Sequence, residues 1–330
     1  MILKAGFIGT GGISSKHLNA MAEMKDKVEI AALCDVYEEA VRRRAEEYGG
    51  KVYTDYRKML DEENLDVLFI CVPPNAHADM EVRAAEKKLH TLVEKPVNLY
   101  LEDAIRANEA FKKAGVITCV GYTAGYSNVD QAIRKFLSDK TIGMVAAERW
   151  GGVPGDENHW WRVMDKSGGM LHEMATHQLN TIRYFAGDVV EVYKKDCLRI
   201  NTNMANYTVP DCEIVTMLFK NGAIGYITTT AALINGGGSG RMDIIVEGHI
   251  RLQLGGESVS ILPKDAATIE IEDKPTLNLD QAFINAIITG DRSLVKNTYE
   301  DGLRTAAITI AANESAKVGK PVKVYQVPPY

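Results

Sequence analysis

The first 120 residues of this 330-residue chain alternate between strand-like and helix-like segments, and this alternation restricts the possible folds more than any other feature. Amphipathic stretches at 38–48, 76–88 and 101–114 separate short apolar runs. The apolar runs are 5–8, 28–34, 67–71, 90–93 and 116–120. Strands that alternate with helices of this length form βαβ units. We therefore predict an α/β fold whose N-terminal part, residues 1–121, is a Rossmann-type, doubly wound parallel sheet.

After about residue 121 the pattern changes to extended segments joined by short turns, which favours a mostly antiparallel sheet with one open face. We predict helices near 129–138, within 168–185, and at 277–290 and 300–317. The predicted strands are 212–219, 223–233, 242–247, 258–262 and 268–271. Residues 122–330 are accordingly expected to form a second domain.

Composition excludes several classes of protein. The chain is 46% hydrophobic and 25% charged, as in globular proteins, and its net charge of −6 argues against nucleic acid or an acidic membrane surface as the main partner. No apolar run approaches the roughly 18 residues of a membrane span. The N-terminus enters a predicted strand without a signal-peptide pattern, and the five cysteines form no C-x-x-C pair. We expect a reduced, cytoplasmic protein.

A glycine-rich loop joins the first predicted strand to the first helix, where a dinucleotide pyrophosphate binds in Rossmann folds. Asp35, at the end of the second strand, is placed to accept hydrogen bonds from a ribose hydroxyl and to repel a 2′-phosphate, which favours NAD over NADP. Ser14 takes the third fingerprint position, and the arginines at 42–44 are expected on a solvated helix face. The candidate loop residues are Gly9, Thr10, Gly11, Gly12 and Ile13.

Two further loops follow apolar strands at the edge where ligands bind in open α/β sheets. Glu94-Lys95-Pro96 puts two charges after the run 91–93, which is costly unless they face a cleft, so Lys95 is a candidate catalytic or cofactor-contacting residue. A surface turn is the alternative. The loop of residues 71–77 either passes over the cofactor or simply connects strand and helix, with Asn75 as a candidate helix cap. Its candidate cofactor residues are Cys71, Pro73, Asn75 and His77.

A polar stripe follows Gly168-Gly169 on the helix predicted within 168–185. At about 100° per residue, Glu173, His177, Asn180 and Tyr184 share one side. The i, i+4 spacing lets Glu173 orient His177 as a general base, although a surface Glu–His pair is the alternative. His172 and His177 diverge too far to share a metal ion, so we expect no metal site. Upstream, Trp161 suits the apolar face of a sugar ring and Arg162 its oxygen atoms, while core packing explains at least one of the tryptophans equally well.

Taken together, these motifs resemble the glucose–fructose oxidoreductase / inositol dehydrogenase (Gfo/Idh/MocA) family, over essentially the whole chain. They are the Gly9-x-Gly11 loop with Asp35, the 71–77 loop, Glu94-Lys95-Pro96, and Gly168-Gly169 with Glu173 and His177. The resemblance implies NAD as cofactor, a dinucleotide-binding domain at 1–121, and a substrate-binding and oligomerisation domain at 122–330. It also implies a homodimer or homotetramer through the open sheet face.

The resemblance further implies roles for individual residues. Lys95 and His177 would flank the nicotinamide and the substrate carbinol, with Glu173 in place of the family's usual aspartate. Gly125 stands where many members carry arginine, and Asn180 replaces a frequent aspartate. Glu94 and Lys95 also count among the expected cofactor contacts. The expected substrate-binding residues are Lys95, Tyr122, Trp161, Arg162, Glu173, His177 and Asn180.

The leading hypothesis is an NAD-dependent dehydrogenase that transfers a hydride between the nicotinamide and a secondary hydroxyl or ketone of a sugar, polyol or inositol. A redox-neutral, NAD-dependent glycoside-cleaving enzyme would use the same residues without net NADH formation. A non-catalytic dinucleotide or sugar sensor is the third interpretation. The presence of Lys95, Glu173 and His177 together argues against it, because a sensor needs no acid–base chemistry.

Overall fold

The computed structural model describes residues 2–153, 155–233, 237–255 and 258–328. The chain forms two compact units, each built from two stretches of sequence. The first comprises Met1–Tyr122 and Leu277–Asp301, and the second comprises Thr123–Thr276 and Gly302–Tyr330.

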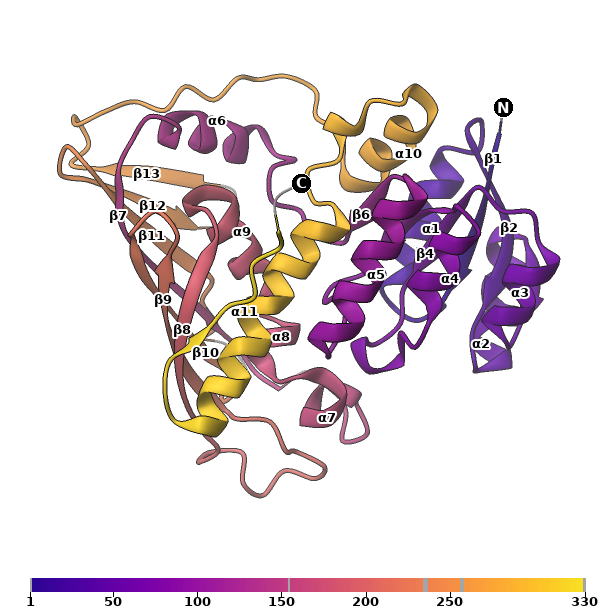
Figure 1. The fold of residues 1–330 in the computed structure, drawn as a ribbon, viewed down its shortest axis with the longest axis horizontal. Helices are drawn as coiled ribbons and strands as arrows, with labels where there is room; N and C mark the ends of the chain where they lie inside the picture. Colours follow the sequence, from indigo (N-terminus) through magenta and orange to yellow (C-terminus); the bar gives the residue numbers. More distant parts are fainter. Residues whose placement is uncertain (1, 154, 234–236, 256–257, 329–330) are drawn as a thin grey trace. The chain divides into compact units, whose positions relative to one another are not determined.

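The first unit is a parallel sheet with strand order β3-β2-β1-β4-β5-β6, which confirms the predicted doubly wound fold (Figure 1). The strand order reverses between β1 and β4, and ligands of such sheets bind outside the carboxyl ends of the strands at this switch. The strands are β1 Leu3–Ile8, β2 Val28–Cys34, β3 Lys51–Tyr53, β4 Val67–Ile70, β5 His90–Val93 and β6 Thr118–Val120. The helices are α1 Ser14–Glu23, α2 Glu38–Tyr48, α3 Tyr56–Glu62, α4 Met80–Glu86, α5 Leu101–Ala114 and α10 Leu279–Thr289.

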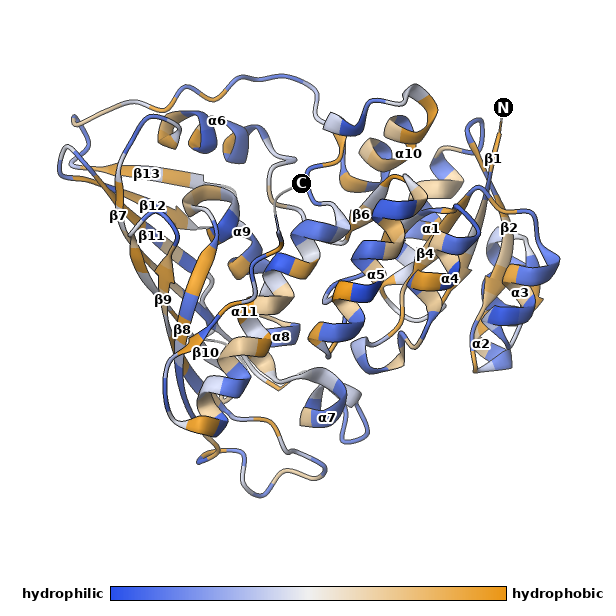
Figure 2. Cartoon of the chain, viewed as in Figure 1, coloured by the Kyte–Doolittle hydropathy of each residue, from blue (hydrophilic) through white to orange (hydrophobic). Residues whose placement is uncertain are grey.

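The centre of this sheet is its most deeply buried part, because helices cover both faces of a parallel sheet. Every residue of β4 is buried, and the rings of Phe7 and Phe69 stack with centroids 4.4 Å apart. Figure 2 shows the apolar residues concentrated on the strands, with hydrophilic residues frequent on α2. Gly115 ends α5 in the left-handed conformation, which glycine adopts without strain.

The second unit contains an eight-stranded sheet in the order β13-β12-β11-β7-β10-β9-β8-β14. Only the β7–β10 pair is parallel among its described pairings, so the sheet is mostly antiparallel, as predicted. Its strands are β7 Ile142–Trp150, β8 Val189–Cys197, β9 Cys212–Phe219, β10 Ile224–Thr230, β11 Arg241–Val246, β12 Ile250–Gly255, β13 Ser258–Leu262 and β14 Val322–Lys323. The helices are α6 Asn128–Leu137, α7 Met164–Ser167, α8 Met170–Glu173, α9 Thr176–Ala186 and α11 Tyr299–Val318, the last beginning just before the second unit.

The two faces of this sheet differ in exposure. Burial alternates strictly along β9, where Val215 and Met217 are buried and Ile214 and Leu218 are exposed. Helices α8, α9 and α11 gather on one side of the sheet in Figure 1. The opposite face of β9 and β10 is open to solvent and carries large apolar side chains, which confirms the predicted open face.

Several predicted elements were wrong or incomplete. The segment 268–271 forms no strand and lies in a stretch without regular structure. The predicted helix 76–88 begins only at Met80, with Asp79 at its N-cap position, because residues 74–76 form a separate short 3₁₀ turn, so Asn75 is not its cap. Strands β3, β7, β8, β12 and β14 were not predicted.

The segment Leu277–Asp301 was predicted to belong to the second domain, residues 122–330, whereas it groups with the first unit. Helix α10 is the reason: Asp280 in its first turn bonds to His17 of α1, and Phe283 packs edge-on against Phe69 of β4. These contacts join residues more than 200 positions apart, and no local sequence pattern encodes them. The assignment of substrate binding to residues 122–330 stays a prediction.

Candidate active site

The glycine-rich loop follows β1 and leads directly into α1. Gly9 has φ +88°, and a Cβ there would lie under 3.0 Å from the Cys71 carbonyl oxygen, so only glycine suits this turn. At Gly11 and Gly12 a Cβ would meet nothing within 4 Å, which leaves the backbone open to a ligand. Ser14 is fully buried and its hydroxyl donates to the Gly11 carbonyl at 2.7 Å, so the third fingerprint position holds the loop onto the helix.

Asp35 lies at the carboxyl end of β2, and its carboxylate ties this end to the loop. Its Oδ2 accepts hydrogen bonds from the Thr10 backbone N–H at 2.7 Å and from the Thr10 hydroxyl at 3.0 Å. Its Oδ1 accepts from the Tyr37 N–H at 3.0 Å. The carboxylate is half-buried, and its Oδ1 keeps a lone pair with which it can accept from a ribose hydroxyl.

Arg44 departs from the prediction of a solvated arginine face. Its guanidinium bonds the Ser15 hydroxyl and lies 3.5 Å from the Thr10 carbonyl oxygen, while Arg42 pairs with Glu38 in solvent. Arg44 thus supports the outer side of the glycine loop. This open loop, an exposed Ile13 and an acidic residue at the end of β2 together fit a dinucleotide.

The 71–77 loop leaves the carboxyl end of β4. Cys71 is buried, its N–H donates to the Ile8 carbonyl at 2.7 Å, and burial raises the pKa of its thiol well above the ordinary value. Pro73 is half-buried and Asn75 is exposed. His77 is only 1% exposed, and its Nδ1 pairs with Glu81 of α4. His77 therefore anchors the loop from inside, and a cofactor contact for it stays a prediction.

Glu94 and Lys95 extend from the carboxyl end of β5. The Glu94 N–H donates to the Ile70 carbonyl at 2.8 Å, so the ladder between β4 and β5 continues to this residue. Its carboxylate belongs to a residue only 7% exposed, and its Oε2 accepts from the Lys95 N–H at 3.1 Å. Lys95 is half-buried and precedes a cis peptide bond to Pro96. The two charges thus separate: Glu94 points into the protein, and Lys95 keeps access to solvent.

In the second unit, Glu173 and His177 do not lie on one regular helix, contrary to the prediction. Glu173 is the last residue of α8 and is 3% exposed, whereas His177 is the second residue of α9 and half-buried. The hydrogen-bond pattern changes between them, because the Ala175 N–H donates to Met170, five residues back. Glu173 and His177 therefore do not share one side of a single helix, as the helical spacing had predicted. The orientation of His177 by Glu173 stays a prediction.

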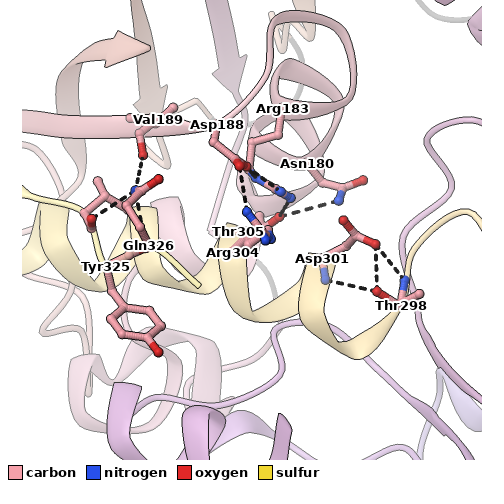
Figure 3. A network of polar contacts seen from close by, with 11 residues as sticks. Asn180, Arg183, Asp188, Val189, Thr298, Asp301, Arg304, Thr305, Tyr325 and Gln326 are labelled. Atoms are coloured by element: carbon pink, nitrogen blue, oxygen red, sulfur yellow. Dashed lines mark hydrogen bonds and ion pairs between the residues drawn. The ribbon is translucent and has the colours of Figure 1, made fainter. Parts of the chain in front are cut away.

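A polar network fixes α9 to α11 within this unit (Figure 3). Asn180 Nδ2 and Arg183 Nη1 both donate to the Thr305 hydroxyl, at 3.5 and 3.1 Å. Asp188 accepts from Arg183 at 2.8 Å and from Arg304 at 2.7 Å. Burial favours a raised pKa for Asp188, but the two arginines outweigh it and lower that pKa. Asn180 is 2% exposed, so its amide faces this network or a buried ligand rather than bulk solvent.

The remaining predicted substrate residues lie in different settings. Tyr122 is fully buried, and its carbonyl accepts from Asn297 Nδ2 at 3.2 Å. Trp161 is half-buried and packs edge-on against Trp160 and His159, with centroids 5.7 and 5.2 Å apart. Arg162 is half-buried and donates to the Gly155 carbonyl at 2.9 Å. Their contact with a substrate stays a prediction.

Two buried cations were missed by the sequence reasoning. His17 lies between Asp280 and Glu94 in the first unit, and Lys194 lies between Glu213 and Asp196 in the second. Lys194 was missed because β8 itself was not predicted. For His17 the available signal was a histidine on the inward side of the helix that follows the glycine loop, but its partners are distant in sequence.

Cysteines scattered in the sequence meet in the structure. Cys197 and Cys212 are opposite each other in the β8–β9 ladder, and their sulfurs and an Asp211 carboxylate oxygen lie within 4.8 Å of one another. Asp211 Oδ2 already accepts backbone N–H groups from Arg199, Ile200 and Asn201. Neither His172 nor His177 belongs to this group.

Both units match family models. Residues 3–122 match the model described as "Oxidoreductase family, NAD-binding Rossmann fold", which makes this protein an NAD-binding oxidoreductase by class. Residues 131–251 match the GFO/IDH/MocA C-terminal domain. The chain belongs to the Gfo/Idh/MocA family, as the resemblance of its motifs indicated.

Similar proteins extend over most of the chain. An uncharacterized oxidoreductase, YrbE of Bacillus subtilis, is 26% identical over 97% of this chain and 96% of its own length. A myo-inositol 2-dehydrogenase of Thermotoga maritima is 27% identical over 71% of this chain and 70% of its own. The crystal structure of the WlbA dehydrogenase from Chromobacterium violaceum with NADH and UDP-GlcNAcA covers 99% of this chain and 97% of its own at a TM-score of 0.85 and 21% identity. Among the described residues, no helix is both long and apolar enough to cross a membrane.

Proposed function

We propose that this protein is an NAD-dependent dehydrogenase that oxidises a secondary hydroxyl of a sugar, polyol or inositol, or reduces the corresponding ketone. The observation that carries the proposal is Lys95, a half-buried cation at the carboxyl end of β5 in an NAD-binding Rossmann sheet, beside a fixed Glu94. The substrate class is supported by the name of the Thermotoga relative, an inositol dehydrogenase, and by the UDP-GlcNAcA present in the WlbA crystal structure.

The proposed chemistry divides among three side chains. His177 accepts the hydroxyl proton, because a neutral imidazole can act as a general base and this one is half-buried, so it still reaches solvent. Lys95 donates a hydrogen bond to the same oxygen and stabilises its developing negative charge. Glu173 is buried four residues before His177 and acts on it as a positioning residue. Bound NAD supplies the acceptor for the hydride that leaves the substrate carbon.

We also propose a preference for NAD over NADP. The Asp35 carboxylate sits where the adenosine ribose lies in Rossmann folds, and it would repel a 2′-phosphate. Asp35→Asn removes this charge, and its amide oxygen can still accept a hydrogen bond from the Thr10 N–H. We expect the ratio of NAD to NADP affinity, measured by nucleotide fluorescence, to fall at least about tenfold. An unchanged ratio would contradict the assigned role of Asp35.

The function is tested by following nicotinamide absorbance with NAD and a panel of inositols, aldoses, sugar acids and polyols. A rise with one substrate establishes a dehydrogenase and its substrate class. Silence across the panel, with NAD retained on the purified protein, would instead favour the redox-neutral glycoside-cleaving reaction, which the same panel of compounds as glycosides would reveal.

Single variants separate catalysis from binding. Lys95→Ala and His177→Ala should each lower kcat by about a hundredfold or more, because each removes a group that acts on the reacting oxygen, while NAD affinity stays nearly unchanged. Lys113→Ala and His249→Asn are matched controls, since both side chains are exposed outside the loops described above. Near-normal turnover in both site variants would overturn the assignment.

We propose further that the open face of the second sheet binds another copy of the chain. A hollow of about 430 Å³ on this unit is lined by Tyr193, Leu218, Ile224 and Tyr226, among others, and the last three are 36–56% exposed. Apolar patches of this kind mark interaction surfaces. Ile224→Asp should dissociate the oligomer in light scattering, whereas Ile271→Asp, equally apolar but outside the sheet, should not. A monomeric wild-type protein would contradict this proposal.

A further inference from the structure

His17 is a fully buried histidine whose two ring nitrogens both face carboxylates. Its Nδ1 lies 2.6 Å from Asp280 Oδ1, and its Nε2 lies 3.0 Å from Glu94 Oε1. Asp280 is 2% exposed and Glu94 is 7% exposed. Three elements therefore meet at one imidazole: α1, the start of α10, and the residue that follows β5.

The geometry defines the protonation state of this ring. A neutral imidazole has one N–H donor, and ionised carboxylates only accept, so both contacts are hydrogen bonds only if His17 is an imidazolium. Burial by itself lowers the pKa of His17, but the hydrogen bonds and charges of Asp280 and Glu94 outweigh it and raise the pKa to about 9. Cys71 also faces this cluster, and its thiol stays neutral because burial and the two carboxylates raise its pKa. The cluster thus carries one positive and two negative charges.

The Glu94 carboxylate is held on every side that the structure describes. Oε1 meets His17, Oε2 accepts the Lys95 N–H at 3.1 Å, and the backbone of Gly121 packs against both oxygens. A Cβ at Gly121 would lie under 3.0 Å from this carboxylate. The backbone of Lys95 is therefore tied to a carboxylate whose own position depends on His17 and, through His17, on Asp280.

We propose that His17 and Asp280 are positioning residues for Lys95: the imidazolium bridge fixes Glu94, and Glu94 fixes the backbone from which the Lys95 ammonium reaches the substrate. The inference rests on the proposed function of Lys95. A buried ion triad contributes little to stability relative to apolar packing, so its placement one residue before Lys95 calls for another reason. The bridge also sets the net charge beside Lys95, because without the imidazolium two carboxylates face it uncompensated.

The test measures the amine of Lys95 directly and needs no substrate. The wild-type protein and variants are labelled with trinitrobenzenesulfonate, which reacts with neutral amines, and labelled peptides are quantified by mass spectrometry. Exposed Lys113 of α5 is the internal reference. In His17→Gln the net charge beside Lys95 becomes more negative, which favours the ammonium over the reactive amine, so Lys95 labelling at about pH 8 should slow by about threefold. Lys113 labelling should not change.

The double variant His17→Gln/Asp280→Asn separates positioning from simple damage. It restores the net charge of the cluster, and its two amides can still bridge to Glu94. Labelling of Lys95 should therefore recover toward the wild-type rate. With a substrate from the panel, kcat should fall about tenfold or more in the single variant and recover in the double, while KM and NAD affinity change little. Unchanged Lys95 labelling in His17→Gln, or a double variant worse than the single, would overturn the inference.

The wild-type protein supplies an independent arm should His17→Gln fail to fold. When His17 loses its proton, the ratio of Lys95 to Lys113 labelling should fall as the pH rises through about 9. A ratio that is featureless in this range would overturn the inference. If no substrate in the panel reacts while the labelling results hold, the proposed function fails and the positioning of Lys95 stands.

Discussion

Each unit buries one cation between carboxylates, and the two cations are built differently. In the first unit, the protonated ring of His17 donates one hydrogen bond to Asp280 and one to Glu94. In the second, Lys194 is fully buried. Its Nζ donates hydrogen bonds to Glu213 at 2.6 Å and to Asn313 at 2.8 Å, and it forms an ion pair with Asp196 at 3.2 Å. The imidazolium can lose its charge near pH 9, so its bridge responds to pH. The lysine network has one more partner than the histidine bridge.

Both networks end on the backbone near a residue of the proposed mechanism. Glu94 holds the Lys95 N–H, and Asn313 donates its Nδ2 hydrogen to the Gly168 carbonyl at 2.8 Å, just before the helix that carries Glu173. In each unit, a buried cation and its partners thus hold the backbone near a residue of the proposed mechanism. The two networks differ in their cation: the first holds an imidazolium that loses its proton near pH 9, and the second holds a lysine ammonium with three partners.

The largest expected effect comes from breaking the lysine network. Lys194→Met leaves Glu213 buried without its cation, which should lower the free energy of unfolding by about 3–5 kcal/mol. Denaturant midpoints measure this loss. Lys195→Met is the matched control, because its side chain is exposed on the same strand and should change stability by less than about 0.5 kcal/mol. A loss of similar size in both variants would remove the distinction between the two lysines.

The next effect is the pH dependence of the histidine bridge. The pKa of His17 is raised from 6.5 to about 9 on folding, so its contribution is complete below pH 6.5 and is lost as the pH rises to about 9. This group should therefore remove up to about 3 kcal/mol of stability across that window. Unfolding curves of wild type and His17→Gln should converge as the pH rises. Parallel pH profiles would show that the bridge is not charged.

Smaller effects come from a glycine beside each of the two buried networks. Gly121→Ala pushes against the Glu94 carboxylate, and Gly169→Ala forces a methyl onto a backbone with φ +87° and ψ 175°. Each should cost about 1–3 kcal/mol in denaturant unfolding, by overpacking and by backbone strain respectively. Only Gly121→Ala should alter the labelling of Lys95. An equal change of Lys95 labelling in Gly169→Ala would mean that the two buried networks are not independent.

Much of the fold and of the cofactor loop could be predicted from the sequence because both are local patterns. The strand–glycine–helix signal of residues 9–14 and the acidic end of β2 lie within one βαβ unit, and each appears where expected. The apolar runs of the parallel strands were similarly clear, since both faces of those strands are buried.

The wrong or missing predictions have two physical causes: some features have no clear local pattern, and others depend on residues far apart in the sequence. Strand β8 contains Lys194 and further charges, so its sequence lacks a clean apolar alternation, although the structure neutralises the lysine through residues on β9 and α11. The break between Glu173 and His177 leaves both linking residues in helical backbone conformations and is invisible to a helical period. The bridge at His17 depends on Asp280, 263 residues away.

The return of Leu277–Asp301 to the Rossmann sheet means that the chain enters each unit twice. A gene fragment that stops at residue 121 would encode every strand of the first sheet but neither α10 nor Asp280. Its product would retain the imidazole without one of its counter-ions and would expose Phe69 where Phe283 packs. Swapping this nucleotide domain between relatives by recombination therefore requires two segments to be exchanged together, because a single crossover would pair the sheet of one parent with the α10 of the other.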